Sequence, residues 1–334
     1  MATKSDRSHP YKLSIVIPCF NEGEHLAQLI GQLKIRIQEL TPNFEILIIN
    51  DGSNDNTRDV ALSIMNAGHI HYIEFSRNFG KESALMAGIN HADGDAVLLI
   101  DADFQHPLDK IKEMELLWKN GYEMIYGVIV NRVRESWWKK LGVRLFYSLM
   151  NSSEVIIPVN AGDFRWLDRR VANALKQLPE KNRFMKGLYA WVGFKSIALP
   201  FEPNERKSGK SSFGLRRLTR LALSGLASFS TTPLQFWIAS GILISGLAVT
   251  YGIYVVIETF IHGNSVSGWP TLTVAIMFFS GIQLLSIGIL GEYIGQIFNE
   301  VKQRPLYLIS EDISSEDTYR LPPKLPTIVP IPEP

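Results

Sequence analysis

The sequence predicts an α/β protein with a mostly parallel sheet, followed by two membrane-spanning helices. Short apolar runs rich in β-branched residues alternate with amphipathic helical patterns from residue 13 to about residue 127. Because strands that alternate with helices form βαβ units, most of these strands should pair in parallel. Two later uncharged stretches, residues 233–257 and 271–291, are each long enough to cross a bilayer as a helix.

The strands are expected at residues 13–18, 44–50, 70–75 and 96–100, with a further strand near 122–127. Helical patterns occupy the intervening residues, about 23–40, 56–67 and 80–92. No Gly-x-Gly-x-x-Gly follows the first strand, which disfavours a dinucleotide-binding fold. An amphipathic pattern near 136–150 sets Trp137 and Trp138 beside lysines, and it suits either a buried core helix or a membrane interface.

Composition narrows the possible classes of protein. The 34 Lys and Arg residues nearly balance the 33 Asp and Glu residues, so the bulk charge gives no reason to expect a nucleic-acid partner. A single cysteine, Cys19, permits no intramolecular disulfide and fits a reducing compartment. The first twelve residues are polar and show no signal-peptide pattern. We therefore expect a flexible N-terminus over residues 1–12 and a cytoplasmic domain over residues 13–210.

The charges that flank the apolar stretches predict their orientation. Lys302 and Arg304 follow the second stretch, whereas the connector near 262–269 holds no Lys or Arg. The positive-inside rule then places both termini in the cytoplasm and a short loop outside the inner membrane. The alternative is a pair of core helices in a soluble protein. Six basic residues precede the first stretch: Arg206, Lys207, Lys210, Arg216, Arg217 and Arg220.

These features divide the rest of the chain into three parts. Residues 211–232 are expected to form a juxtamembrane amphipathic helix, and residues 233–298 a two-helix transmembrane hairpin. Residues 299–334 would be a cytoplasmic tail. Because this tail is acidic and then proline-rich, we expect disorder from about residue 310.

The most informative segment is the acidic pair Asp101 and Asp103, directly after the strand at 96–100. Ligands bind at the carboxyl ends of strands in open α/β sheets. Two carboxylates at such a point can share a hard divalent cation, which would neutralise a diphosphate. An isolated Asp-x-Asp is weak evidence, since most acidic pairs lie on solvated faces, but its position after a buried strand strengthens the interpretation.

Polar segments also follow the other expected strands. Residues 18–22 close the first, residues 50–57 the second and residues 76–82 the third. Asp51 lies where its carboxylate could accept a hydrogen bond from a nucleotide base, although its segment also has the composition of a turn and a helix N-cap. The third segment adds cations that suit either a phosphate or structural pairing.

In their order along the chain, these segments resemble those of family 2 glycosyltransferases with the GT-A fold. In particular they are similar to the polyprenyl-phosphate glycosyltransferases. Their motifs most resemble those of bactoprenol glucosyltransferases, and the dolichyl-phosphate mannose synthases are a related group. The resemblance covers about residues 12–309. The matching motifs include Asp101-Ala102-Asp103-Phe104-Gln105 and Gly162-Asp163-Phe164-Arg165, together with residues 183–187, 191–193, 205–210, 228–233 and 291–295.

The resemblance implies roles for individual residues. Donor binding falls to Pro18, Glu22, Asp51, Lys81, Asp101, Ala102 and Gln105. Mg²⁺ or Mn²⁺ would be held by Asp101, Asp103 and Gln105. Catalysis falls to Asp103, Asp163 and Arg206, and the acceptor phosphate to Arg206, Lys210 and Arg132. His106 departs from the family pattern, which usually has an acidic residue there; we interpret it as an exposed loop residue, with an added metal ligand as the alternative.

The implied reaction is inverting transfer of glucose from UDP-glucose to undecaprenyl phosphate, for modification of a cell-surface glycan such as the O-antigen of lipopolysaccharide. A phosphate acceptor, with a second pKa of about 6, is largely ionised at neutral pH and needs no strong base. Asp163 would therefore mainly orient the substrates. Expected partners are the nucleotide sugar, the polyprenyl phosphate, the membrane, a second copy of the chain, a flippase and a second glycosyltransferase.

Three alternatives stay open at this point. One is the same reaction with another donor, GDP-mannose or a modified UDP-sugar. Another is a non-catalytic membrane sensor of nucleotide sugars. The third is a processive polysaccharide synthase, which the sequence disfavours because Gly162 stands where the Gln-x-x-Arg-Trp motif of such enzymes needs glutamine before Arg165 and Trp166.

Overall fold

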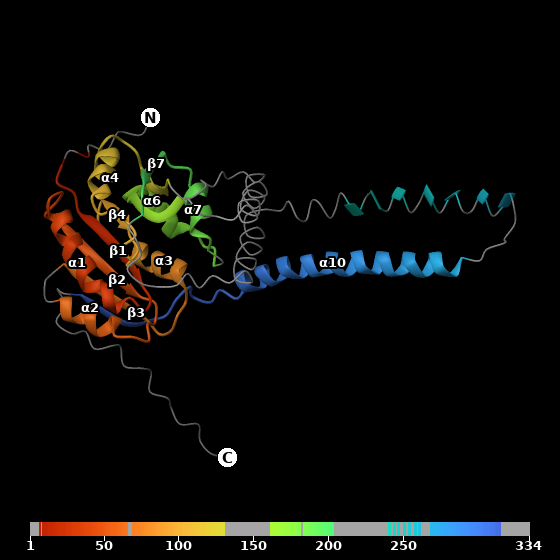
Figure 1. Cartoon of the computed structure of the whole chain (residues 1–334), viewed down its shortest axis with the longest axis horizontal. Helices are drawn as coiled ribbons and strands as arrows, with labels where there is room; N and C mark the ends of the chain where they lie inside the picture. The colour runs from red at the N-terminus through yellow and green to blue at the C-terminus, as the bar shows by residue number, and fades with distance from the viewer. Residues whose placement is uncertain are drawn as a thin grey trace, which may run out of the picture. The chain divides into compact units, whose positions relative to one another are not determined.

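A computed structural model describes residue 7 and residues 9–65, 69–130, 161–181, 183–203 and 268–314, with part of the range 240–261 (Figure 1). The chain divides into two units. The first comprises residues 1–136, 158–212 and 304–334, and it contains the sheet. The second comprises residues 137–157 and 213–303.

The first unit is built on an eight-stranded sheet with the order β7-β5-β6-β4-β1-β2-β3-β8. Strands β1 to β4 pair in parallel, β6 runs antiparallel to β4 and β5, and β8 runs antiparallel to β3. Strand β7 is parallel to β5. The expected mostly parallel α/β sheet is confirmed. The strands are β1 (Leu13–Cys19), β2 (Phe44–Asn50), β3 (Ile70–Phe75), β4 (Ala96–Leu99), β5 (Met124–Ile129), β6 (Ala161–Asp168), β7 (Ser196–Phe201) and β8 (Ile309–Ser314).

Helices follow the strands as the alternating pattern predicts. The three expected helices begin and end within two residues of their predicted bounds. Further helices follow β4 and β6, and another lies between α6 and β7. The helices of this unit are α1 (Gly23–Gln38), α2 (Thr57–Met65), α3 (Lys81–His91), α4 (Lys110–Lys119), α6 (Arg169–Gln177) and α7 (Met185–Trp191).

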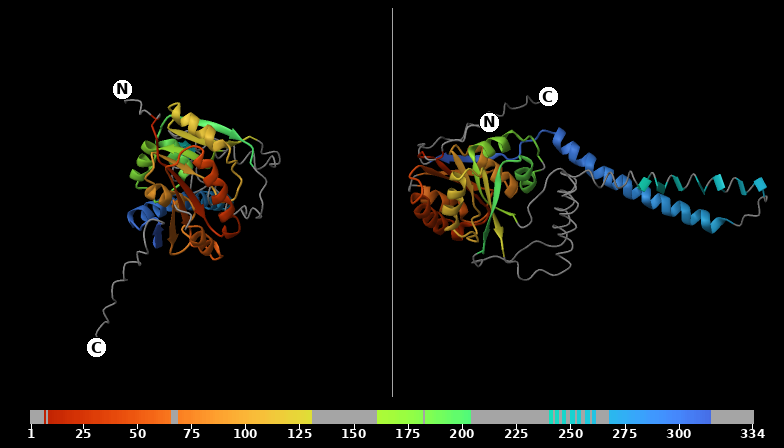
Figure 2. Two further views of the ribbon diagram at one scale, coloured as in Figure 1. Left: turned by 90° about the vertical axis from the view of Figure 1, so that its left-hand side faces the viewer. Right: turned by 90° about the horizontal axis from the view of Figure 1, so that it is seen from above.

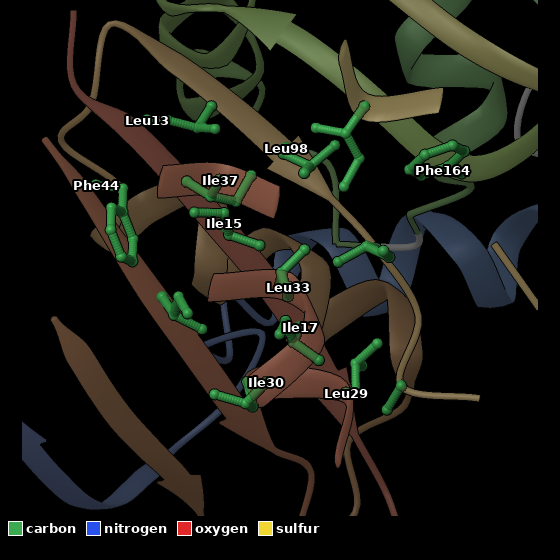
Figure 3. Close-up of a cluster of buried hydrophobic side chains, with 14 of the residues drawn as sticks. Leu13, Ile15, Ile17, Leu29, Ile30, Leu33, Ile37, Phe44, Leu98 and Phe164 are labelled. Carbon is green, nitrogen blue, oxygen red and sulfur yellow. The ribbon is translucent and has the colours of Figure 1, made fainter. Parts of the chain in front are cut away.

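The core is formed on both faces of the central strand β1. Its residues are apolar and buried throughout, as a strand covered on both faces requires. Leu13, Ile15 and Ile17 lie in one cluster with α1, whose buried residues recur at helical spacing along one side (Figure 3). On the opposite face, α3 packs so closely on β1 that a Cβ at Gly88 would lie 2.0 Å from Val16 Cγ1. Strand β1 is thus covered by α1 on one face and by α3 on the other.

The C-terminal tail begins with an ordered strand. Strand β8 lies beside β3, where the blue segment meets the orange strand in Figure 1. The expectation of disorder from about residue 310 is wrong for residues 310–314, because the acidic side chains have partners on the sheet. Glu311 accepts two hydrogen bonds from Arg58 Nη2, at 2.8 and 2.9 Å, and Asp312 pairs with His71. Residues 315–334 lie outside the described part of the chain.

The segment before β1 is also partly fixed. Arg7 pairs with Asp168 at 2.6 Å, and the Tyr11 hydroxyl donates to Glu115 at 2.7 Å. Tyr11 is only 5% exposed and belongs to the core cluster. The expectation of a flexible N-terminus through residue 12 is therefore wrong for Arg7 and for Tyr11, which pack against α4 and β6.

In the second unit, α10 (Trp269–Val301) is a single continuous helix of 33 residues, visible along its length in the right-hand view of Figure 2. Within the described residues, its portion Phe278–Val301 alone has the length and apolar composition of a membrane span. The expected first span, residues 233–257, and the juxtamembrane helix at 211–232 lie largely or wholly outside the described residues. The two-helix hairpin consequently stays a prediction.

Candidate active site

The predicted strand-end carboxylates gather where β4 and β6 meet. Asp101 follows β4 by two residues, and Asp163 lies within β6. Leu99 is paired with Arg165 in the antiparallel ladder, so the same register continued by two residues brings Asp163 opposite Asp101. The sheet itself therefore positions these two carboxylates, although they are far apart in the sequence.

Lys81 joins the two carboxylates. Its Nζ lies 2.7 Å from Asp101 Oδ1, 2.8 Å from Asp101 Oδ2 and 2.8 Å from Asp163 Oδ2. Desolvation alone would raise the pKa of Asp101, but the charge of Lys81 and a hydrogen bond with His106 outweigh it and hold that pKa below its usual range. The two carboxylates conversely raise the pKa of Lys81 despite its desolvation. Asp101 and Lys81 thus form a charged pair at neutral pH.

The position of Lys81 depends on Asp51. Lys81 is the first residue of α3, and the Asp51 carboxylate accepts hydrogen bonds from the backbone N–H groups of Phe79 and Gly80 just before it, at 2.6 and 2.9 Å. Gly52, at φ 64°, contacts the same segment so closely that a Cβ would lie 2.5 Å from the carbonyl carbon of Arg77. In this structure Asp51 therefore fixes the loop that presents Lys81; its predicted contact with a nucleotide base stays a prediction.

The donor-binding residues predicted near β1 lie at the same edge of the sheet. Pro18 is within β1, paired with Ile49, and Ala102 is buried beside Asp101. Glu22 precedes α1, and its pKa is raised by partial burial and by the negative charges of Asp103 and Asp101. Glu22 thus adds a third carboxylate whose charge interacts with those of Asp103 and Asp101.

Asp101, Asp103 and His106 form the candidate metal centre. One ligand atom from each of the three lies within 4.8 Å of the others, which suits a single divalent cation. Asp103 Oδ1 also accepts a hydrogen bond from the backbone N–H of Gln105 at 3.1 Å. The interpretation of His106 as an exposed loop residue is wrong: the side chain is 8% exposed because it packs against Phe164.

Four further residues surround Asp163 that sequence reasoning did not single out. Glu82 accepts a hydrogen bond from the backbone N–H of Met185 at 3.2 Å, which links α3 to α7. Arg165 is 2% exposed, with its guanidinium 4.1 Å from the centre of the Tyr189 ring. Lys186 and Tyr189 interact electrostatically with Asp163. Arg165 lies in β6, a strand that the sequence pattern did not predict.

Three predicted acceptor-side residues cannot be placed. Arg132, Arg206 and Lys210 all lie outside the described residues, as does the amphipathic pattern near 136–150. The structure thus brings together Lys81, Asp101, Asp103 and Asp163 from the predicted set, with Glu22 interacting electrostatically. It adds Glu82 and Arg165, and it groups His106, for which a metal ligand was the alternative interpretation, with the acidic pair.

Comparison with known proteins identifies the family of the chain. Residues 14–176 match the model of glycosyl transferase family 2. An uncharacterized glycosyltransferase of Synechocystis sp., sll0501, is 42% identical over 302 residues, covering 90% of this chain and 95% of that protein. The bactoprenol glucosyl transferase of Shigella phage SfV is 41% identical over 305 residues, covering 90% of this chain and 99% of that protein.

Among solved structures, glucosyl-3-phosphoglycerate synthase from Mycobacterium tuberculosis in complex with Mn²⁺ and UDP-glucose has a TM-score of 0.43 and 17% identity, over 65% of this chain and 77% of that one. The family is established by the relatives that match over nearly their full length. This chain belongs to family 2 of the glycosyltransferases. It is a glycosyltransferase similar to the bactoprenol glucosyl transferases, which sets aside the non-catalytic sensor.

Proposed function

We propose that the chain transfers glucose from UDP-glucose to undecaprenyl phosphate, with inversion at the anomeric carbon. The observation that carries the proposal is the position of Lys81, whose ammonium group lies between Asp101 and Asp163 and beside the candidate metal centre. Such a centre suits a donor with a diphosphate leaving group. The names of relatives that are about 41% identical over nearly their whole length support bactoprenol as the acceptor and glucose as the sugar.

Asp101 and Asp103 would hold Mg²⁺ or Mn²⁺, with Gln105 close by. A divalent cation, when bound, stabilises the negative charge that gathers on the leaving diphosphate. Lys81 supplies a second positive charge at the same place, because it already contacts Asp101. A cation at Asp101 and Asp103 and the ammonium group of Lys81 would therefore act together on the leaving diphosphate.

Asp163 would orient the acceptor and the sugar rather than remove a proton. An undecaprenyl phosphate is largely ionised at neutral pH, since the second pKa of a phosphate monoester is about 6. Its oxygen can attack the anomeric carbon directly, on the face opposite the departing diphosphate. Arg206 and Lys210, with Arg132 as a further candidate, would bind the acceptor phosphate.

The membrane placement follows from the same acceptor. A polyprenyl phosphate lies in the bilayer, and α10 provides a helix of sufficient length to anchor the chain there. Both termini and the first unit would lie on the cytoplasmic side of the inner membrane. The product would then need a flippase and a second glycosyltransferase, and the chain would act as a homo-oligomer.

The test is sugar transfer by the purified protein in detergent. Undecaprenyl phosphate, Mg²⁺ or Mn²⁺ and a panel of radiolabelled nucleotide sugars would be supplied, with Asp103→Asn as the inactive control. We expect label in the lipid phase from UDP-glucose, lost in the variant, and a β-linked product by NMR. If label enters the lipid phase from GDP-mannose or a modified UDP-sugar instead, that nucleotide sugar is the donor. An α-linked product would exclude inversion.

Two variants separate the proposed roles. Asp163→Asn should reduce transfer strongly, and normal activity in that variant would exclude even an orienting role. Arg206→Ala should abolish transfer to the lipid while UDP-glucose still binds, because only the acceptor phosphate loses its partner. Loss of donor binding in Arg206→Ala would place this arginine on the donor side instead.

A further inference from the structure

The His106 side chain is held rigidly beside the acidic pair. It lies between β4 and α4, and its ring stacks on Phe164 with centroids 4.8 Å apart and planes 15° apart. The Phe201 ring packs against it from β7, at 5.6 Å and 66°. Because two aromatic side chains of the sheet fix the plane of the imidazole, its orientation is set before any ligand binds.

The two ring nitrogens of His106 have one hydrogen-bond partner between them among the described residues, and it belongs to the acidic pair. Nε2 lies 3.3 Å from Asp101 Oδ2, and Nδ1 is buried without a hydrogen-bond partner among the described residues. A buried ring nitrogen ordinarily has a partner. Nε2 is therefore the ring nitrogen that faces the acidic pair.

The hydrogen bond between His106 and Asp101 is long for a purely structural contact. A hydrogen bond between a protonated imidazole and a carboxylate is usually 2.7–2.9 Å long. The 3.3 Å separation is longer, and Asp101 already has a close partner in Lys81 at 2.7 Å. One ligand atom each of the imidazole and the two carboxylates lies within 4.8 Å of the others, a spacing that suits ligands of a single divalent cation.

We infer that His106 is a third protein ligand of the cation, through Nε2, and that it biases the site towards Mn²⁺ over Mg²⁺. Carboxylates suit both ions, whereas an imidazole nitrogen suits transition metals and is a poor ligand for Mg²⁺. The inference deepens the proposed function, since it rests on a cation at Asp101 and Asp103.

The test measures the metal and not the reaction. Mn²⁺ would be titrated into the purified protein in detergent, without donor or acceptor, and followed by electron paramagnetic resonance. Electron spin echo modulation of bound Mn²⁺ should show a directly coordinated ¹⁴N in the wild-type protein. Labelling the protein with ¹⁵N-histidine should shift that modulation to the ¹⁵N frequency, a result that needs no variant and so does not depend on how a substitution folds.

Substitutions then locate the nitrogen. His106→Asp keeps an oxygen ligand and should remove the nitrogen modulation while Mn²⁺ still binds. His106→Asn should weaken Mn²⁺ binding at least about tenfold and Mg²⁺ binding less, as expected for loss of a group that tunes a metal centre. His91→Asn, on α3, is the matched control and should keep the wild-type signal, since His91 contacts the Ala87 carbonyl instead.

Other outcomes would overturn the inference. Wild-type protein that binds Mn²⁺ without nitrogen modulation, with binding lost in Asp103→Asn, would make His106 only a positioning residue for Asp101. Absence of any Mn²⁺ binding would remove the cation site itself. Both results are independent of sugar transfer, so either one can be told apart from failure of the proposed reaction.

Discussion

At the scale of single residues, Lys81 balances the charge of the site. Asp101 and Asp163 would repel each other across the β4–β6 ladder without a cation between them, and the Lys81 ammonium occupies that position at 2.7–2.8 Å from both. Because it starts α3, Lys81 is also held by the loop that Asp51 fixes. The same lysine thus connects the folding of a loop to the electrostatics of the site.

Replacement of Lys81 with methionine should lower the rate of sugar transfer by about 10²–10³, the usual cost of losing one donor that stabilises developing charge. The measurement is the initial rate at saturating donor. Lys119→Met, which removes a partly exposed lysine on α4, is the control and should leave the rate within about twofold of wild type. Normal turnover in Lys81→Met would show that the metal centre alone stabilises the charge of the leaving diphosphate.

Glu82 makes stability depend on pH. Burial, reinforced by the charge of Asp163, raises the pKa of Glu82 from its ordinary 4.5 to about 7. The folded chain therefore keeps this proton up to about pH 7, whereas the unfolded chain releases it near pH 4.5. Since folding then binds a proton, the contribution of Glu82 to stability is present at low pH and is lost as the pH rises between these values.

Glu82→Gln should remove that dependence, because glutamine resembles the protonated acid. The gain in unfolding temperature over wild type should be small near pH 4.5, increase with pH and level off above about pH 7. Thermal unfolding in detergent, followed by fluorescence of the buried Trp118 and Trp166, measures it. Glu24→Gln, at an exposed position on α1, should show no such trend. A gain that is equal at pH 5 and pH 8 would contradict the assignment.

The residues that sequence reasoning located are those directly after apolar strands. Asp101 and Asp103 could be found because β4 is short, apolar and followed by polar residues. Glu82 was not singled out, and His106 was interpreted as an exposed loop residue, because both are buried by segments distant in the sequence: α7 for Glu82, and the aromatic rings of β6 and β7 for His106. A local pattern carries no information on such contacts.

At the scale of elements, the approach of α3 to β1 decides how the site is built. Gly88 faces Val16, and the absence of a side chain lets the helix lie directly on the central strand. Since α3 begins at Lys81, its seating on β1 also determines where that ammonium group lies. Close helix–strand packing and the geometry of the site are therefore linked through one glycine.

Gly88→Ala should destabilise the first unit by about 1–3 kcal/mol, the usual cost of overpacking a well-packed core. Gly31→Ala is the matched control: it lies on α1 with no atom within 4 Å of the added Cβ, and it should stabilise by about 0.5–1 kcal/mol. Chemical unfolding in detergent compares the two. Equal effects of the two substitutions would mean that α3 can move away from β1 at no cost.

The elements predicted well are those whose hydrophobic pattern is local. Strands β1 to β4 agree with their expected bounds because each is a short, mostly apolar run, and helices α1 to α3 occupy the intervals between these runs. Strand β6 was missed because Asp163 and Arg165 interrupt its apolar pattern. Strand β8 was missed because Glu311 and Asp312 resemble a solvated tail until Arg58 and His71 are known to face them.

At the scale of the whole molecule, the proposed acceptor requires the catalytic unit to stay at the cytoplasmic face of a membrane. One candidate span, within α10, lies in the described part of the chain, and by itself it would anchor the chain without fixing which side of the membrane the sheet occupies. Two spans with a short external connector would place residues before and after them on the same side. The sheet requires its strands before and after the spans to be on the same side of the membrane. Strand β8, which follows α10 in the chain, pairs with β3, which precedes both expected spans.

Labelling of introduced cysteines with a membrane-impermeant maleimide in intact bacteria tests this topology. The native Cys19 is 1% exposed and should give no background. Asn264→Cys, in the predicted external connector, should be labelled in intact cells, whereas Glu24→Cys, exposed on α1, should be labelled only after the inner membrane is permeabilised. Labelling of both positions only after permeabilisation would mean that neither apolar stretch crosses the bilayer. The chain would then bind the polyprenyl phosphate from the membrane surface, and the pairing of β8 with β3 would need no hairpin to bring the chain back.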